Sequence, residues 1–220
     1  MTAVFDKAIA CANSIIDSFK NTGQLVDVST DPAYGISDRV FTSDRYRRAH
    51  VSIVDARESK KLWLLHVTVF PHVNDSSPIY GFDIVAGPSK VSGAFHDFSA
   101  VGRADHPMMS WFADETKDLE WNKKRELPEW AKAIFSDNMV AIGAVGSEEL
   151  DEFVALGLKS LDYYLEHVGC TDTADYSELQ NRYCYYQKQN PHTPRVLVNL
   201  GFTEQQAQDF VQHTLFPEIG

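Results

Sequence analysis

Residues 61–86 read KLWLLHVTVFPHVNDSSPIYGFDIVA and decide the fold. Two mostly apolar runs in this stretch, 61–70 and 79–86, are rich in β-branched and aromatic residues, and a polar, turn-forming segment separates them. This pattern predicts two strands of one hairpin. The period of two continues on both sides, so we also expect strands at about 48–55 and 92–98.

Helical patterns flank this group of strands. Apolar residues between Val4 and Phe19 recur with helical spacing, and residues 147–168 and 176–189 predict two further helices, the first capped by Ser147. We expect a capping box at 203–206 to open a last helix, a strand at 139–145, turn-rich structure over 21–47, and loops with short helices over 107–137. Because hairpins join the strands, the chain is predicted to be one α/β domain over residues 1–220, an α/β/α sandwich with a central antiparallel sheet flanked by helices.

Composition excludes several classes of function. The formal net charge of −11 disfavours nucleic acid and anionic membranes as main partners. No apolar run approaches the roughly 20 residues that a membrane span needs. The three cysteines, Cys11, Cys170 and Cys184, are scattered and form no CxxC pair, so neither a disulfide framework nor a zinc site is indicated. We expect a cytoplasmic protein.

Two titratable residues, His66 and Asp83, interrupt the two apolar strands. A symmetric loop at 71–78 would place them opposite each other, and a loop centred on Glu58 would place His50 opposite His66. The three side chains would then form one polar row across three strands, unless a bulge or slip breaks it. Because an unpaired buried charge is costly, we expect this row to carry shifted pKa values suited to proton delivery.

Other interpretations of the row are weaker. A buried Asp–His pair can be purely structural, and opposed His and Asp side chains can ligate a metal, but HExxH and other metal-binding spacings are absent, so no metal is predicted. The sequence also lacks the GxSxG, P-loop and GxGxxG motifs. GPSKVSG at 87–93 is interpreted as a hairpin turn.

PIYGFDIVAGPSKVS at 78–92 resembles the ferredoxin-dependent bilin reductases, and most closely their phycocyanobilin:ferredoxin oxidoreductase branch. Further family motifs follow in the same order: LHVTVFP at 65–71, RELPEW at 125–130, FS at 135–136 and YCYYQKQNPHTPRVL at 183–197. The resemblance covers most of residues 46–216 and is weak in the first 45.

The resemblance implies a function and a set of site residues. Such an enzyme reduces biliverdin IXα through bilin radicals, binds no metal, flavin or nicotinamide, and takes electrons from an external reduced 2Fe–2S ferredoxin. We expect a monomer. By position, Asp83 is the proton donor, His66 and His50 form its proton network, Ser92 and Arg125 hold the propionates, Tyr80 and Trp130 line the pocket, and Asn190, His192, Thr193 and Arg195 close over the ligand.

Two positions depart from the family pattern. Ser52 stands where phycocyanobilin producers carry Glu, and Pro191 stands where some phycoerythrobilin producers carry a second Asp. The chain resembles a phage-encoded offshoot that lacks the Glu and makes phycoerythrobilin. We therefore expect a four-electron reduction to phycoerythrobilin through 15,16-dihydrobiliverdin. Phycocyanobilin as the product, or a non-catalytic bilin carrier, are the alternatives.

An acidic chain needs a local basic surface to dock an acidic ferredoxin. One candidate surface contains six cationic residues: Arg45, Arg47, Arg48, Arg57, Lys60 and Lys61. A second is the cluster Lys123, Lys124 and Arg125. Docking through either surface predicts that turnover falls as salt rises.

Overall fold

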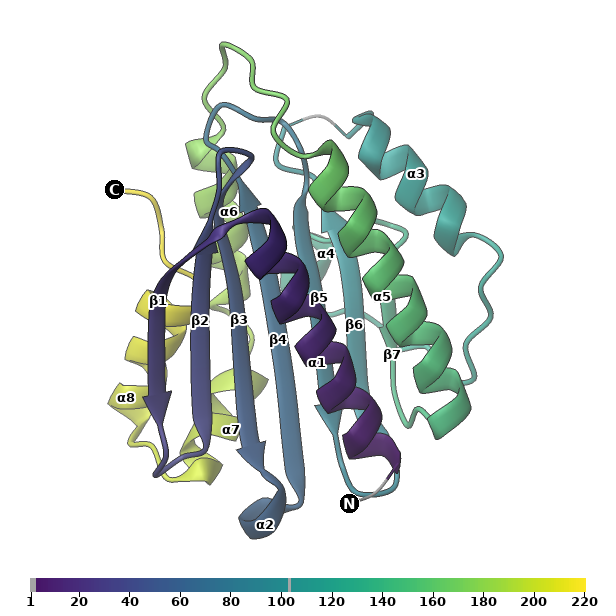
Figure 1. Cartoon of the computed structure of the whole chain (residues 1–220), viewed down its shortest axis with the longest axis vertical. Coiled ribbons are helices and arrows are strands. Elements are labelled where there is room, and N and C mark those ends of the chain that lie inside the picture. The colour runs from purple at the N-terminus through teal and green to yellow at the C-terminus, as the bar shows by residue number, and fades with distance from the viewer. Residues whose placement is uncertain (1–2, 103) are drawn as a thin grey trace.

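The computed structural model describes residues 3–102 and 104–220. Its centre is one antiparallel sheet of seven strands that follow one another in chain order (Figure 1). The strands are β1 Gln24–Asp31, β2 Ile36–Thr42, β3 Tyr46–Ala56, β4 Leu62–Pro71, β5 Ile79–Ala86, β6 Val91–Ser99 and β7 Val140–Ile142. The expected antiparallel meander is confirmed.

Helices cover both faces of the sheet (Figure 1). One face packs against α1 Ala3–Thr22, α3 Pro107–Thr116 and α5 Ser147–His167. The other face packs against α4 Glu129–Lys132, α6 Ser177–Gln187, α7 His192–Leu200, α8 Glu204–Asp209 and the π-helix η1 Phe210–Leu215. This arrangement is the α/β/α sandwich expected from the sequence. A short helical turn, α2 Arg57–Lys60, connects β3 to β4.

The alternation of side chains along the central strands assigns each residue to one helical layer. On β4, Leu65, Val67 and Val69 belong to the core beneath α1 and α5. His66 and Phe70 point to the opposite layer, where Phe70 joins the smaller core beneath the C-terminal helices. The polar row predicted from the sequence therefore faces the C-terminal helices.

The sequence analysis did not predict β1 and β2. Both strands lie within residues 21–47, which were expected to be turn-rich. Every residue of β1 is exposed, so burial imposes no alternation of apolar and polar residues along this strand. In addition, a register shift between Leu25 and Asp27 interrupts its pairing with β2. The exposed edge strand is therefore the part of this sheet that the sequence pattern predicts least well.

Smaller differences occur at the ends of elements. The N-cap of α5 is Gly146 and not Ser147, whose side chain makes no capping bond. The strand expected at 139–145 is reduced to the three residues of β7. The capping box at Thr203 and Gln206 is present, as predicted. Among the described residues, no helix is both long and apolar enough to cross a membrane.

Candidate active site

A cavity of about 400 Å³ lies between the sheet and the C-terminal helices. Its floor is formed by β3 to β6, and its walls by residues 125–139, α6, α7 and the end of η1. Among its polar lining residues are Ser52, His66, Asp83, Ser92, Asp97, Arg125, Asn190, His192 and Thr193. A cavity of this size that is mostly apolar with a few converging polar groups is typical of a small-molecule site.

His66 and Asp83 meet at the centre of the floor. They are direct partners across β4 and β5, as the symmetric loop predicted. Nδ1 of His66 lies 2.6 Å from Oδ1 of Asp83, and the ring of Phe216 covers His66 edge-on at 5.4 Å between centroids. The expectation that both groups are buried is wrong: their side chains are 19% and 35% exposed, because both open into the cavity.

The predicted pairing of His50 with His66 is also wrong. Ser52 is the direct partner of His66, and His50 is the partner of Thr68. Ser52 was expected opposite Leu64, which instead pairs with Val54.

The cause is the connection between β3 and β4. β3 ends one residue later than predicted and β4 begins one residue later than predicted, so the turn is centred on residue 59 and not on Glu58. The helical turn α2 and the left-handed conformation of Lys61 (φ 56°) close it. A shift of two positions keeps every side chain on its face, so His50, Ser52 and His66 still point toward the same layer.

His50 has a partner that the sequence did not reveal. Its Nε2 lies 2.9 Å from Oδ1 of Asp38 on β2, and both residues are buried. Burial lowers the pKa of His50 to about 4, against the opposing effect of Asp38. His50 does not line the cavity, and its ring centroid lies 6.3 Å from that of His66. Because β2 was not predicted as a strand, no pairing argument could have found Asp38.

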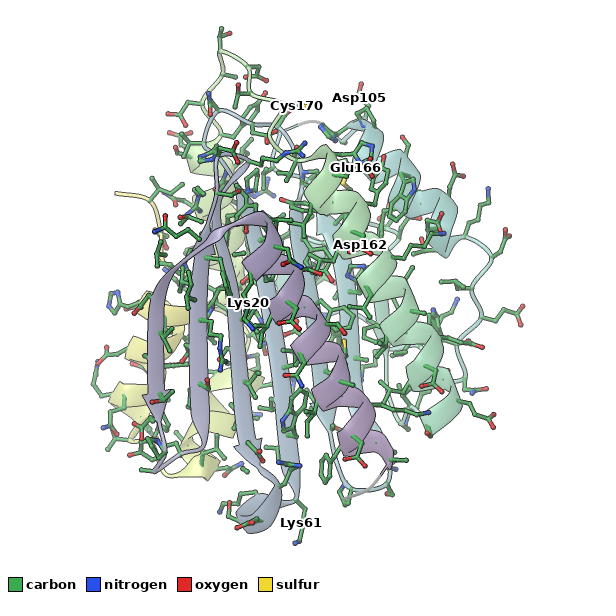
Figure 2. The ribbon with its side chains drawn as sticks, viewed as in Figure 1. Lys20, Lys61, Asp105, Asp162, Glu166 and Cys170 are labelled. Atoms are coloured by element: carbon green, nitrogen blue, oxygen red, sulfur yellow. The ribbon has the colours of Figure 1, made fainter. Side chains whose placement is uncertain are left out.

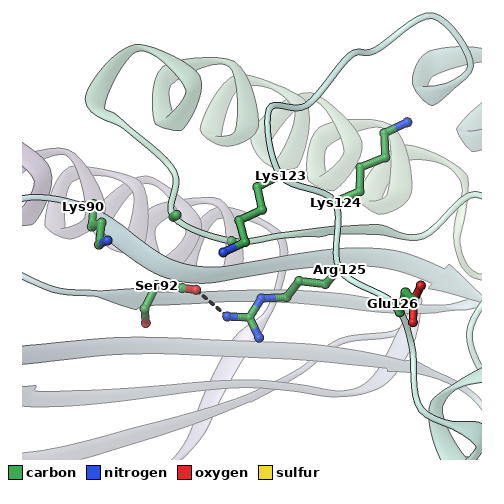
Figure 3. Close-up of a pocket in the computed structure, with 8 residues that line it drawn as sticks. Lys90, Ser92, Lys123, Lys124, Arg125 and Glu126 are labelled. Carbon is green, nitrogen blue, oxygen red and sulfur yellow. Dashed lines mark hydrogen bonds between the residues drawn. The ribbon is translucent and has the colours of Figure 1, made fainter.

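At the rim of the cavity, Arg125 lies in a second, basic hollow of about 510 Å³ (Figure 3). Its guanidinium donates to the backbone oxygen of Ser92 at 2.6 Å and lies 5.6 Å from the ring centre of Phe95. Lys90, Lys123 and Lys124 also line the hollow, and the side chain of Lys124 points away from Arg125. Ser92 and Arg125 border both hollows, so they lie where an anionic group of a ligand in the cavity could be bound.

The remaining residues of the predicted site do not all gather at the cavity. Trp130, Asn190, His192 and Thr193 line it. Arg195 is exposed on α7 and is absent from the lining. Tyr80 is fully buried on the other face of the sheet, where its hydroxyl donates to the backbone oxygen of Gly157 at 3.0 Å. Three positions separate Tyr80 from Asp83, and an odd spacing within a strand places side chains on opposite faces.

Asp97 is a further lining residue that sequence analysis missed. It is 1% exposed and accepts hydrogen bonds from the hydroxyls of Ser99 and Ser136 and from the backbone N–H of Ser136. Burial raises the pKa of Asp97 to about 6, although these bonds oppose the shift. Ser136 belongs to the FS motif, so Asp97 ties the segment that carries Arg125 and Trp130 to the sheet.

The first candidate basic surface is not continuous. Arg47 and Arg48 are half-buried under the C-terminal helices, where they bond to Gln180 and to the backbone oxygen of Thr214. Arg45 bonds to the backbone oxygen of Glu166, at the end of the sheet opposite Lys61 (Figure 2).

The other cations of both candidate surfaces gather at one end of the sheet. The β3–β4 and β5–β6 connections lie at this end. They are close neighbours, because a Cβ atom built on Gly87 would lie only 4.0 Å from the backbone oxygen of Lys61. N–H of Arg125 donates to the backbone oxygen of Ala141 on the neighbouring β7. We call this surface the basic end and define it as Arg57, Lys60, Lys61, Lys90, Lys123, Lys124 and Arg125.

Comparisons with known proteins point to one family. A family profile described as ferredoxin-dependent bilin reductase matches residues 19–217, and so begins earlier than the motifs suggested. The chain is 32% identical over 191 residues to a phycocyanobilin:ferredoxin oxidoreductase of Prochlorococcus marinus, covering 83% of this chain and 71% of that protein. It is 30% identical over 190 residues to the same enzyme of Gloeobacter violaceus, covering 82% and 73%.

Two solved structures are similar along nearly the whole chain. A structure of a PcyX protein superposes with a TM-score of 0.71 at 29% identity, covering 97% of this chain and 99% of that one. Phytochromobilin synthase from tomato, solved in complex with biliverdin, superposes with a TM-score of 0.66 and covers 96% and 82%. At 15% identity, the second comparison supports the fold alone.

Proposed function

Because the chain belongs to the family of ferredoxin-dependent bilin reductases, we propose that it reduces biliverdin IXα in two two-electron steps. The first reduces the C15–C16 bridge and gives 15,16-dihydrobiliverdin. The second reduces the A-ring diene and gives phycoerythrobilin. The observation that carries this proposal is the Asp83–His66 pair, open to a cavity whose lining includes Ser52 and not a second carboxyl at that position.

The protein's part in the reaction is to supply protons and to hold the substrate. The first electron of each pair from ferredoxin makes the conjugated bilin more basic and leaves a radical, and the second electron pairs with it. Asp83 then transfers a proton to the reduced bilin, which traps the electron as a C–H bond. His66 returns a proton to Asp83 through their 2.6 Å contact. The redox chemistry belongs to ferredoxin and the bilin.

The cavity supplies the orientation. Two propionates of the bilin would lie toward Arg125, the hydroxyl of Ser92, and Lys90 and Lys123 of the basic hollow, since guanidinium and ammonium groups bind carboxylates well. Trp130 would pack against the tetrapyrrole, and Asn190, His192 and Thr193 at the start of α7 would close the cavity over it.

Ser52 supports phycoerythrobilin as the product. Reduction of the D-ring vinyl group needs a proton donor near that ring, and a serine hydroxyl is too weak an acid to serve at neutral pH. Phycocyanobilin is therefore disfavoured, although Pro191 leaves the site without the second Asp that some phycoerythrobilin producers use. Asp83 would have to serve both reductions.

We further propose that ferredoxin docks on the basic end. This surface borders the cavity through Arg125, so an electron donor bound there would lie beside the propionate side of the substrate. The acidic net charge of the chain makes a local cationic surface more important, because like charges elsewhere repel an acidic partner.

One anaerobic assay tests the proposed product. Purified protein, biliverdin and reduced ferredoxin are mixed, and the products are separated beside authentic bilins. We expect 15,16-dihydrobiliverdin first and phycoerythrobilin at the end. Phycocyanobilin as the main product would overturn the assignment of product only. A stable blue-green complex that ferredoxin does not change would favour the non-catalytic carrier.

A further inference from the structure

Two Asp–His pairs lie on four consecutive strands, and only one of them reaches the cavity. His66 and Asp83 line it, whereas Asp38 and His50 lie behind them on β2 and β3. Asp38 is 4% exposed and His50 is fully buried. Neither residue lines the cavity. The ring centroid of His50 lies 6.3 Å from that of His66, so His66 is the link between this second pair and the reaction.

We infer that Asp38 is a positioning residue that fixes the tautomer and charge of His50 and thereby supports proton supply to His66 and Asp83. This inference rests on the proposed function. With Asp38 ionised, the hydrogen bond has one direction: a carboxylate only accepts, so Nε2 of His50 carries the proton and donates to Oδ1 of Asp38 at 2.9 Å. Nδ1 of His50 is then the free basic nitrogen, and it is buried with no hydrogen-bond partner in the described part of the chain.

The surrounding charges give Asp38 a second effect. Burial is the largest effect that lowers the pKa of His50. The positive charge of Arg48, half-buried on the same face of β3, lowers it further, as does His66. Asp38 is the group that acts in the opposite direction. Without the negative charge of Asp38, nothing would offset the repulsion between Arg48 and a protonated His50. The imidazolium form of His50 would then be harder to populate.

A proton balance shows why this matters for turnover. Each two-electron reduction consumes two protons. For every proton that Asp83 delivers, one proton must return through His66, while no electron moves between the side chains. His50 can accept that proton at Nδ1 only as an imidazolium, with Nε2–H still held by Asp38. Asp38 therefore acts on the return of protons to the site and not on the first proton that Asp83 delivers.

The test compares Asp38→Asn with the wild type under saturating ferredoxin. We expect unchanged biliverdin affinity and an unchanged first protonation in a single turnover. Sustained turnover should fall about tenfold, as when a carboxylate that orients a histidine is lost, with a larger solvent deuterium isotope effect. Asp44→Asn removes the same charge from an exposed position and should change nothing. Wild-type rate and isotope effect in Asp38→Asn would overturn the inference.

A double variant and one spectrum complete the design. If Asp38 acts through His50, adding Asp38→Asn to His50→Gln causes no further loss, whereas additive losses overturn the inference. Should Asp38→Asn not fold, nitrogen NMR of the wild type decides, because a neutral His50 with its proton on Nδ1 and not on Nε2 contradicts the inference. A wild type that does not reduce biliverdin would instead count against the proposed function.

Discussion

Ser52 lies directly opposite His66 across β3 and β4, so the side chain that departs from the family pattern is the immediate neighbour of the histidine that contacts Asp83. Ser52 is 4% exposed and lines the cavity. The short serine leaves this part of the floor without an acid.

Restoring a carboxyl at this position should change the product. In Ser52→Glu we expect phycocyanobilin to appear beside phycoerythrobilin, because a well-placed general acid is worth about 10²–10⁴-fold in rate. Ser52→Gln has the same length but no transferable proton, and it should yield no phycocyanobilin. Chromatography of anaerobic products measures both. Identical product mixtures from the two variants would show that the acid at this position does not choose the product.

Removing the central acid should stop turnover without preventing binding. Asp83→Asn preserves shape and can still accept a hydrogen bond from His66, so biliverdin should bind as in the wild type. Turnover should fall by about 10²–10⁴-fold, the usual contribution of a general acid, and a bilin radical should persist in electron paramagnetic resonance spectra. Asp162→Asn on the exposed face of α5 serves as the charge-matched control (Figure 2). A native rate in Asp83→Asn would assign the acid elsewhere.

Reversing one charge on the basic end should weaken ferredoxin docking. The side chain of Lys124 points away from Arg125 (Figure 3), so Lys124→Glu should raise the KM for ferredoxin and leave biliverdin affinity intact. The rate should also become less sensitive to salt, since exposed charges are screened over about 8 Å at physiological ionic strength. Lys20→Glu on α1 makes the same change on another face. Equal effects of the two variants would exclude a specific role for the basic end.

Buried histidines should make the fold sensitive to acid. His96 is 1% exposed, its Nδ1 lies 2.8 Å from the backbone oxygen of Gly81, and burial lowers its pKa from 6.5 to about 4. Between these values the unfolded chain binds a proton that the folded chain does not, so His96 loses its contribution to stability as pH falls. Asp97, with its pKa raised to about 6, acts in the opposite direction and offsets part of this loss.

The variant His96→Phe isolates this effect. At pH 7 it should unfold about 1 kcal/mol more easily, because the bond to Gly81 is lost. On acidification, the stability gap to the wild type should close by about 1 kcal/mol per pH unit and then reverse in favour of the variant. Urea unfolding at several pH values measures this. A gap that stays constant with pH would contradict the lowered pKa of His96.

Much of the fold followed from local patterns. The central strands, α1, α5, α6 and the capping box at Thr203 are each encoded by the spacing of residues close in sequence. The opposition of His66 and Asp83 also followed, because the segment between β4 and β5 keeps the pairing symmetric. The sequence alone therefore determined the fold class, the family resemblance and the central pair of the candidate site.

Only the tertiary structure decided the rest of the site. The register of His50 depended on the helical turn α2, whose length no strand pattern reports. The contact of Asp38 with His50 could be recognised only from the position of β2 in the sheet. The partial burial of Arg47 and Arg48 depends on C-terminal helices more than 100 positions away in the sequence. The physical reason is that periodicity records which face of an element is apolar, whereas the partner of each face is set by connections and packing between distant segments.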